Sequence, residues 1–222
     1  MPVKQRYLIL LSCLLFSPSL LAQGFSEEQQ KDIAAFTDRM VTEHKFTQQE
    51  LEQLFSRVEH KPGIIEAITR PAEAKPWFRY RPIFLTEQRI NGGLEFWREH
   101  APLLARAEKE YGVPAQIIVA IIGVETFYGR HKGNYRVIDA LSTLGFGYPP
   151  RGKFFRGELE HFLLMAREEE REPLEFVGSY AGAMGMPQFI PSSFRAYAVD
   201  FDGDGKRDLW DNHADIIGSV AN

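Results

Sequence analysis

A single acidic residue lies in an otherwise apolar segment of the chain. The run from Ala115 to Gly129 reads Ala-Gln-Ile-Ile-Val-Ala-Ile-Ile-Gly-Val-Glu-Thr-Phe-Tyr-Gly, and Glu125 is its only charged side chain. A helix that is apolar on all faces is predicted to be buried at the centre of a domain. Burial disfavours the charged form of a carboxyl group and so raises its pKa. A carboxylic acid that stays protonated near neutral pH can act as a general acid.

A purely structural role for this carboxylate is the alternative. Buried carboxylates also form ion pairs that only stabilise a fold. The sequence offers possible partners for Glu125 in Arg79, Arg81 and Arg151. Position along the chain therefore leaves catalysis and structural pairing both open.

A glycine-rich segment carries a second group of polar side chains. It reads Gly178-Ser-Tyr-Ala-Gly-Ala-Met-Gly-Met-Pro-Gln-Phe-Ile-Pro-Ser-Ser193. It lacks the lysine of a phosphate-binding loop, and its glycines would let a ligand approach the backbone closely. The amide of Gln188 can both donate and accept hydrogen bonds, which suits sugar hydroxyls and amides. A tight packing corner between helices is the alternative explanation for the glycines.

An acidic loop near the end of the sequence has the spacing of a calcium site. It reads Asp200-Phe-Asp-Gly-Asp-Gly-Lys-Arg-Asp-Leu-Trp-Asp211, with acids at EF-hand positions 1, 3 and 5 and glycine at position 6. Such a density of hard oxygen ligands favours Ca²⁺. We expect a structural calcium ion and no organic cofactor; a metal-free surface turn is the alternative. The expected ligands are Asp200, Asp202, Asp204, the Lys206 carbonyl and Asp211.

The elements that must position these groups are predicted to be helices almost throughout. Capping-box sequences begin at Ser26 and Thr47. One long helix is expected from about Thr86 to Tyr111, and another from Ala115 to about Tyr128. Further helices are expected over residues 137–144, 154–167, 192–197 and 216–222. Strand-like alternation is scarce, so the sequence predicts a mainly α fold.

Composition narrows the class of protein. The chain has 222 residues, of which 44% are hydrophobic and 25% charged, as in an ordinary globular protein. The net charge of −4 argues against a nucleic-acid-binding protein, which needs a basic face. The single cysteine excludes an intramolecular disulfide.

The first 22 residues have the order of a secretory signal peptide. Lys4 and Arg6 precede an apolar run over residues 7–16, and Ala22 is a small residue suited to cleavage. The apolar run is shorter than the about 20 residues that span a bilayer. We therefore expect export to the periplasm. A lipid-anchored outer-membrane form through Cys13 is the less favoured alternative, and a retained N-terminal anchor stays open.

Several segments together resemble one enzyme family. They are Ile122-Gly-Val-Glu-Thr-Phe-Tyr-Gly129, Asp139-Ala-Leu-Ser-Thr-Leu144, Gly157-Glu-Leu-Glu-His-Phe-Leu-Leu-Met-Ala-Arg167, the glycine-rich segment 178–193 and Asp208-Leu-Trp210. On these motifs the chain resembles the lytic murein transglycosylases of the membrane-bound B type. The resemblance implies a lysozyme-like helical core and a transglycosylase domain over residues 23–222. We expect an N-terminal helical part over about 23–85 and a catalytic core over about 86–222, truncated at its C-terminal end.

The resemblance also implies roles for individual residues. The catalytic glutamate of the family falls on Glu125, its glycan-contacting serine and glutamine fall on Ser179 and Gln188, and a cleft tyrosine falls on Tyr80. Asp215 becomes the last calcium ligand. The family loop that often carries two basic residues has only Arg151 here, a departure that concerns recognition of the stem peptide. The rings expected to stack on sugars are Phe127, Tyr128 and Tyr148.

These roles imply a specific reaction on peptidoglycan glycan strands. Protonated Glu125 would donate to the glycosidic oxygen between N-acetylmuramic acid and N-acetylglucosamine. The sequence offers no second buried acid for two-carboxylate hydrolysis, so the substrate acetamido group and C6 hydroxyl would complete a 1,6-anhydro product. A hydrolytic muramidase and a non-catalytic peptidoglycan- or Ca²⁺-binding module are the alternatives. We expect a monomer that touches the cell wall or membrane only peripherally and binds no nucleic acid.

Overall fold

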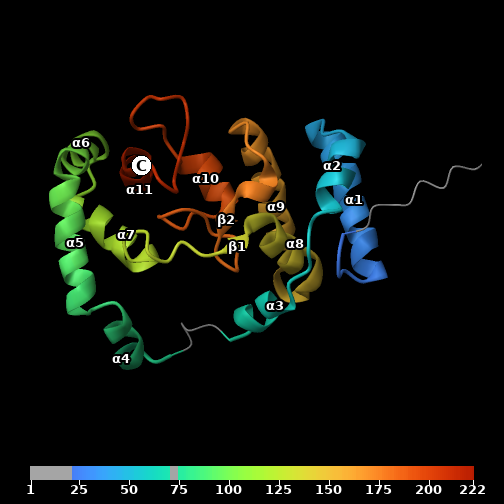
Figure 1. The fold of residues 1–222 in the computed structure, drawn as a ribbon, viewed down its shortest axis with the longest axis horizontal. Coiled ribbons are helices and arrows are strands. Elements are labelled where there is room, and N and C mark those ends of the chain that lie inside the picture. The colour runs from blue at the N-terminus through green and yellow to red at the C-terminus, as the bar shows by residue number, and fades with distance from the viewer. Residues whose placement is uncertain (1–21, 71–74) are drawn as a thin grey trace, which may run out of the picture.

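The structure is a computed structural model that describes residues 22–70 and 75–222. It is mainly helical, as the sequence predicts (Figure 1). The predicted signal peptide lies, except for Ala22, outside the described residues. The helices are α1 (Glu27–His44), α2 (Gln48–Phe55), α3 (Pro62–Ile68), α4 (Trp77–Tyr80), α5 (Glu87–Glu99), α6 (Ala101–Tyr111), α7 (Ala115–Thr126), α8 (Val137–Gly147), α9 (Gly152–Glu168), α10 (Pro191–Tyr197) and α11 (His213–Ala221).

Short elements connect these helices. Strands β1 (Tyr135–Arg136) and β2 (Val177–Gly178) form one antiparallel pair, in which Tyr135 lies opposite Gly178. Single 3-10 turns span Arg81–Ile83, Pro149–Arg151 and Pro173–Glu175. The β pair lies between the two groups of helices in Figure 1.

Two predicted helix starts are confirmed by their hydrogen bonds. The side chain of Ser26 accepts from the backbone of Gln29, whose side chain in turn accepts from the Ser26 backbone. Thr47 and Glu50 make the same reciprocal pair at the start of α2. Such capping boxes satisfy backbone N–H groups that the first helical turn leaves without a partner.

The prediction of one long helix over residues 86–111 is wrong. The structure has two helices there, because α5 ends at Glu99 and α6 begins at Ala101, with His100 between them at φ −110° and ψ 19°. Pro102 explains the break. Proline has no N–H to donate to the carbonyl four residues earlier, and its ring clashes with that carbonyl.

The helices enclose two hydrophobic cores. One core joins α1, α2 and α3 to α8, α9 and α10; in Figure 1 α1, α2, α8 and α9 lie on the right, and α10 lies nearer the centre. The other joins α5, α6 and α7 to α11, on the left. The N-terminal helices therefore share a core with helices from the second half of the chain. Within the described residues, no helix is both long and apolar enough to span a membrane.

Candidate active site

Helix α7 is buried on one face only, which corrects the prediction of burial on all sides. Its core face is formed by side chains such as Ile118 and Ile122, which pack against the second core. The opposite face leaves Ile117 48% exposed, Ile121 38% and Val124 47%. This exposed apolar stripe has helical spacing, because neighbours on one face recur three and four residues apart.

Glu125 lies at the end of this stripe, one turn after Ile121. Its side chain is exposed, and within the described residues it forms no hydrogen bond or ion pair. The surrounding protein removes part of its hydration, and this partial burial raises its pKa above the ordinary glutamate value. None of the suggested arginine partners is bound to it. Glu125 is therefore accessible and unpaired, and its partial desolvation raises the pKa of its carboxyl group relative to an ordinary glutamate.

The backbone turns sharply directly after Glu125 and Thr126. Phe127 and Tyr128 both adopt left-handed conformations, with φ 52° and 57°, and Gly129 follows at φ 84°. The helix consequently ends at Thr126, two residues earlier than predicted. Consecutive left-handed residues other than glycine are costly, and such conformations concentrate at functional sites.

Packing explains the two aromatic residues in this turn. Phe127 is 8% exposed, and the guanidinium groups of Arg89 and Arg130 lie 4.7 and 4.5 Å from its ring centroid. The half-buried ring of Tyr128 enters a slot between α5 and α7, where Gly93 and Gly123 leave room for it. Both rings therefore have a packing role in the turn, and the expectation that they also offer stacking faces to sugars stays a prediction.

The glycine-rich segment folds into a compact set of turns. Its positive-φ positions include Gly182 at 81° and Gly185 at 70°. Met184 forms isolated bridges with Gly178 and Phe189, which brings the two ends of the segment together. Gln188 itself has φ 55°, a left-handed conformation that glycine normally favours.

Ser179 and Gln188 present opposite hydrogen-bonding groups. The Oγ of Ser179 accepts from the backbone N–H groups of Ala181 and Ala183, so its own proton is free to be donated. The Nε2 of Gln188 donates to the carbonyl oxygens of Lys132 at 3.2 Å and Gly185 at 3.0 Å. Both N–H bonds of the amide are therefore engaged, and its Oε1 is left as an acceptor.

One buried hydroxyl joins the end of α7 to this segment. Thr126 donates from Oγ1 to the carbonyl of Met186 at 2.8 Å. Lys132 adds a second connection, because its carbonyl accepts from Gln188 and its Nζ donates to the Trp210 carbonyl at 2.8 Å. The sequence alone did not point to Thr126 or Lys132, because neither their residue types nor their spacing indicates a functional role.

Tyr80 approaches this region through a chain of side chains. Its ring lies 5.0 Å from that of Phe84, edge to face. The guanidinium of Arg89 lies over both Phe84 and Phe127, and it donates to the carbonyl of Gly123 in α7. The segment that carries Tyr80 is therefore tied to the end of α7.

Tyr148 and Arg151 lie elsewhere, at the turn between α8 and α9. Tyr148 packs against the first core. Arg151 lies 4.2 Å from the ring centroid of Phe154 and lines a separate pocket of about 550 Å³. Among the described residues, no hydrogen bond or ion pair links Tyr148 or Arg151 to Glu125.

The acidic loop gathers three of its predicted ligands. Carboxylate oxygens of Asp200, Asp202 and Asp204 all lie within 4.8 Å of one another. Three backbone N–H groups donate to Asp200 and lower its pKa. These backbone hydrogen bonds fix the Asp200 carboxylate, and the loop fits the oxygen-rich chemistry of a calcium site.

Asp211 and Asp215, the last two predicted calcium ligands, lie in different surroundings. Neither Asp211 nor Asp215 belongs to this acidic cluster, and Asp211 forms an ion pair with Lys132 at 3.0 Å, so its role as a ligand stays a prediction. Asp215 is fully buried beneath the loop and accepts from the N–H groups of Phe201 and Asp208. Burial raises its pKa, and the nearby charges of Asp202 and Asp200 raise it further.

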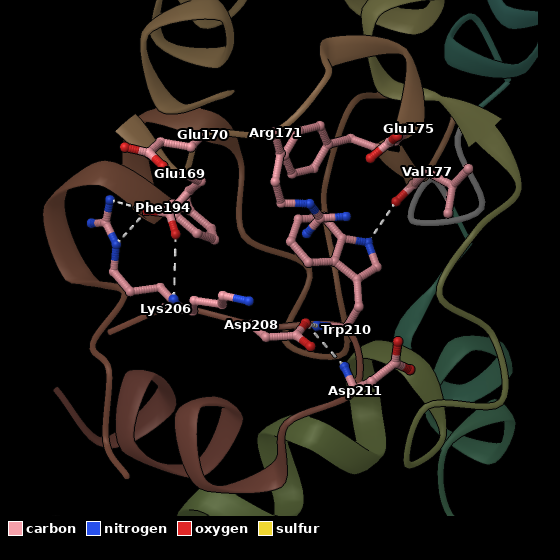
Figure 2. Close-up of a pocket in the computed structure, with 12 residues that line it drawn as sticks. Glu169, Glu170, Arg171, Glu175, Val177, Phe194, Lys206, Asp208, Trp210 and Asp211 are labelled. Atoms are coloured by element: carbon pink, nitrogen blue, oxygen red, sulfur yellow. Dashed lines mark hydrogen bonds and ion pairs between the residues drawn. The ribbon is translucent and has the colours of Figure 1, made fainter. Parts of the chain in front are cut away.

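A pocket of about 620 Å³ lies between the end of α9 and residues 206–211 (Figure 2). The guanidinium of Arg171 lies 4.3 Å from the ring centroid of Phe176 and 5.3 Å from that of Trp210. Its side chain thus covers the aromatic rings that could have stacked on a sugar. Neither Glu125 nor Gln188 lines this pocket, and we place the candidate active site at Glu125.

Comparison with known proteins identifies the family. A family model described as "Transglycosylase SLT domain" matches residues 28–222. The chain belongs to this family. It is 48% identical over 197 residues to the membrane-bound lytic murein transglycosylase B of Escherichia coli K12, with 84% of this chain and 54% of that protein covered.

Solved structures of the family confirm the fold. The soluble lytic transglycosylase SltB1 from Pseudomonas aeruginosa is 61% identical with a TM-score of 0.83, over 86% of this chain and 64% of that one. The Escherichia coli lytic transglycosylase Slt35 in complex with calcium is 46% identical with a TM-score of 0.84, over 91% and 64%. The predicted mainly α, lysozyme-like architecture is confirmed. The chain spans less than two thirds of the length of each of these relatives.

Proposed function

We propose that this transglycosylase SLT domain cleaves the β-1,4 bond between N-acetylmuramic acid and N-acetylglucosamine in peptidoglycan and forms a 1,6-anhydro product. The observation that carries the proposal is the state of Glu125. It is exposed, has no ion-pair partner among the described residues, and has a raised pKa. Membership of the family supports the same substrate class, because the Escherichia coli relative is a murein transglycosylase.

Glu125 would act twice in this reaction. In its protonated form it donates to the glycosidic oxygen, and the bond from that oxygen to C1 of the muramic acid breaks. The resulting carboxylate then removes the proton from the C6 hydroxyl of the same sugar. The freed oxygen bonds to C1 and closes the anhydro ring, so no water is consumed and Glu125 ends protonated again.

Ser179 and Gln188 would hold acetamido groups of the glycan. The free proton of the Ser179 hydroxyl suits an acetamido carbonyl, and the free Oε1 of Gln188 suits an acetamido N–H. One side chain thus donates and the other accepts, which matches the two polar ends of an amide. An acetamido carbonyl held near C1 can also stabilise the oxocarbenium-like centre, a role that a second carboxylate would otherwise fill.

Tyr80, Tyr148 and Arg151 are assigned more remote contacts. Tyr80 would border the glycan near the end of α7, to which Arg89 ties its segment. Arg151 and Tyr148 would meet a more distant part of the strand or its stem peptide. The pocket beside Phe154 supports this assignment, because it presents the exposed guanidinium of Arg151.

Mass spectrometry of products from purified murein sacculi tests the reaction. We expect anhydro-muropeptides; reducing-end products, heavier by one water, would indicate a hydrolytic muramidase instead. Binding to sacculi without any product would indicate a non-catalytic module. Glu125→Gln should lose about 10²–10⁴-fold in rate, whereas Glu95→Gln, which removes an exposed carboxylate from α5, should not. Near-normal activity of Glu125→Gln would refute the proposal.

We also propose a structural calcium ion in the acidic loop. The clustered carboxylates of Asp200, Asp202 and Asp204 would bind it. The Lys206 carbonyl and the buried Asp215, which accepts from the N–H of Phe201 in the loop, would complete the ligand set. The Slt35 structure in complex with calcium supports this assignment. The loop continues into Leu209, whose carbonyl accepts from Met186 at 2.7 Å. A bound ion would therefore steady the segment that carries Gln188.

The cellular setting is the periplasm. Residues 1–22 have the sequence of a secretory signal, and peptidoglycan lies in that compartment. The Escherichia coli relative is called membrane-bound, which is compatible with peripheral contact at the wall or membrane. We propose that the chain acts on glycan strands as a monomer.

A further inference from the structure

Thr126 follows Glu125 in the sequence but faces the interior. It is 1% exposed, whereas Glu125 is exposed on the stripe of α7. We propose that Thr126 is a positioning residue, whose hydroxyl fixes Glu125 relative to the segment that carries Ser179 and Gln188. This inference rests on the proposed function and adds a residue to its machinery.

The Thr126 hydroxyl uses both of its hydrogen-bonding capacities inside the protein. Oγ1 donates to the carbonyl of Met186 at 2.8 Å and accepts from the N–H of Gly129 at 3.1 Å. Within the described residues, no other hydrogen bond satisfies that carbonyl or that N–H. A side chain of the same shape without a hydroxyl would therefore leave two backbone groups without partners.

These two bonds join the elements on which the reaction depends. Gly129 belongs to the left-handed turn that ends α7, and Met186 precedes Gln188 by two residues. The same junction is closely packed, because a Cβ on Gly129 would lie 2.7 Å from Cε of Met186. The turn then runs to Lys132, whose carbonyl holds the amide of Gln188. Thr126 is thus the side chain that bonds Glu125's own helix directly to the glycine-rich segment.

A purely stabilising role for Thr126 makes a different prediction, and Thr37 supplies the control. Thr37 is 4% exposed in α1 and donates from Oγ1 to the carbonyl of Ile33 at 2.9 Å. Thr37→Val removes a buried hydroxyl of the same type from the first core. If Thr126 only stabilised the fold, Thr126→Val and Thr37→Val would lower kcat to the same extent wherever they lower the melting temperature equally.

Kinetics on soluble, uncross-linked peptidoglycan strands test the proposal. Misplacement of reacting groups by about 1 Å can cost roughly 100-fold in rate, so we expect Thr126→Val to lower kcat by at least about tenfold. KM should change by less than about threefold, because the loss concerns transition-state geometry. Thr126→Ser should restore most of kcat, and Thr37→Val should leave kcat unchanged. A normal kcat in Thr126→Val, or equal losses in both valine variants, would overturn the inference.

Amide hydrogen exchange gives a readout that does not require activity. In Thr126→Val we expect faster exchange at Gly129 and over residues 184–188, with no such change in Thr37→Val. Unchanged exchange at those amides would also overturn the inference. The two proposals fail separately: an active Glu125→Gln would refute the general-acid assignment, whereas an inactive Glu125→Gln beside a fully active Thr126→Val would refute only the role of Thr126.

Discussion

A Cβ atom on Gly93 would lie 2.5 Å from the hydroxyl oxygen of Tyr128. Gly93 belongs to α5, and Tyr128 to the left-handed turn after α7, so the phenol ring fits where the two helices approach each other. The slot exists because Gly93 in α5 and Gly123 in α7 have no side chains to fill it. The Tyr128 ring therefore anchors the left-handed turn that follows Glu125.

We therefore expect Gly93→Ala to destabilise the protein by about 1–3 kcal/mol through overpacking. Tyr128→Phe removes the atom that clashes and leaves a ring carbon at a tight but tolerable 3.2 Å. In the Tyr128→Phe background, Gly93→Ala should leave the free energy of unfolding almost unchanged, because alanine favours a helix by about 0.5–1 kcal/mol over glycine. Denaturant unfolding of the two single variants and the double variant measures this coupling. Equal costs of Gly93→Ala in both backgrounds would contradict it.

The pH dependence of the reaction should report on Glu125. Proton donation needs the acid form, so kcat/KM should fall as pH rises through the pKa of this group. Partial burial places that pKa above the ordinary value of 4.5. We expect the basic limb of the profile to have its midpoint above 4.5. A midpoint at or below the ordinary value would exclude Glu125 as the general acid.

The raised pKa of Glu125 should also lower the free energy of unfolding at neutral pH. Its pKa is raised in the folded state, so between the ordinary value and the folded value the native protein binds more protons than the unfolded chain. The free energy of unfolding therefore falls as pH rises through this window. Glu125→Gln removes the effect, so its melting temperature should match the wild type below the ordinary pKa and exceed it above the window. Thermal melts at several pH values test this; a constant difference would contradict it.

Calcium should raise the melting temperature, and a chelator should reverse the gain. At about 100-fold excess over Kd the ligand contributes about 2.7 kcal/mol, which corresponds to roughly 5–10 °C for a chain of this size. Asp202→Ala should abolish the shift, whereas Asp211→Ala should retain it, because Asp211 is paired with Lys132. The shift should weaken at acidic pH as buried Asp215 becomes protonated. An equal response of both alanine variants would rule out this ligand set.

Local signals in the sequence predicted much of the helical framework. The capping boxes at Ser26 and Thr47 identify two helix starts, because they act within one turn of chain. The break at His100 was missed although Pro102 marks it, because the apolar periodicity continues on both sides. Burial of α7 was overestimated for a different reason. An apolar run shows that a helix can be buried, but not which of its faces the rest of the fold covers.

The candidate site was predictable only in part. Glu125 stands out because a charge in an apolar run is rare, and Asp200 because acids at alternate positions suit a cation. Thr126 carries no such signal, since its role depends on a contact with Met186, sixty residues away. Spacing alone could not show that Asp211 forms an ion pair with Lys132.

The two cores each combine segments from both halves of the polypeptide. Helices α1 to α3 pack against α8 and α9 rather than against α4 and α5, which follow them directly. Backbone continuity between α3 and α4 is therefore not what keeps the N-terminal piece in place. A protease that nicked the chain there would leave two fragments that copurify and separate only in denaturant.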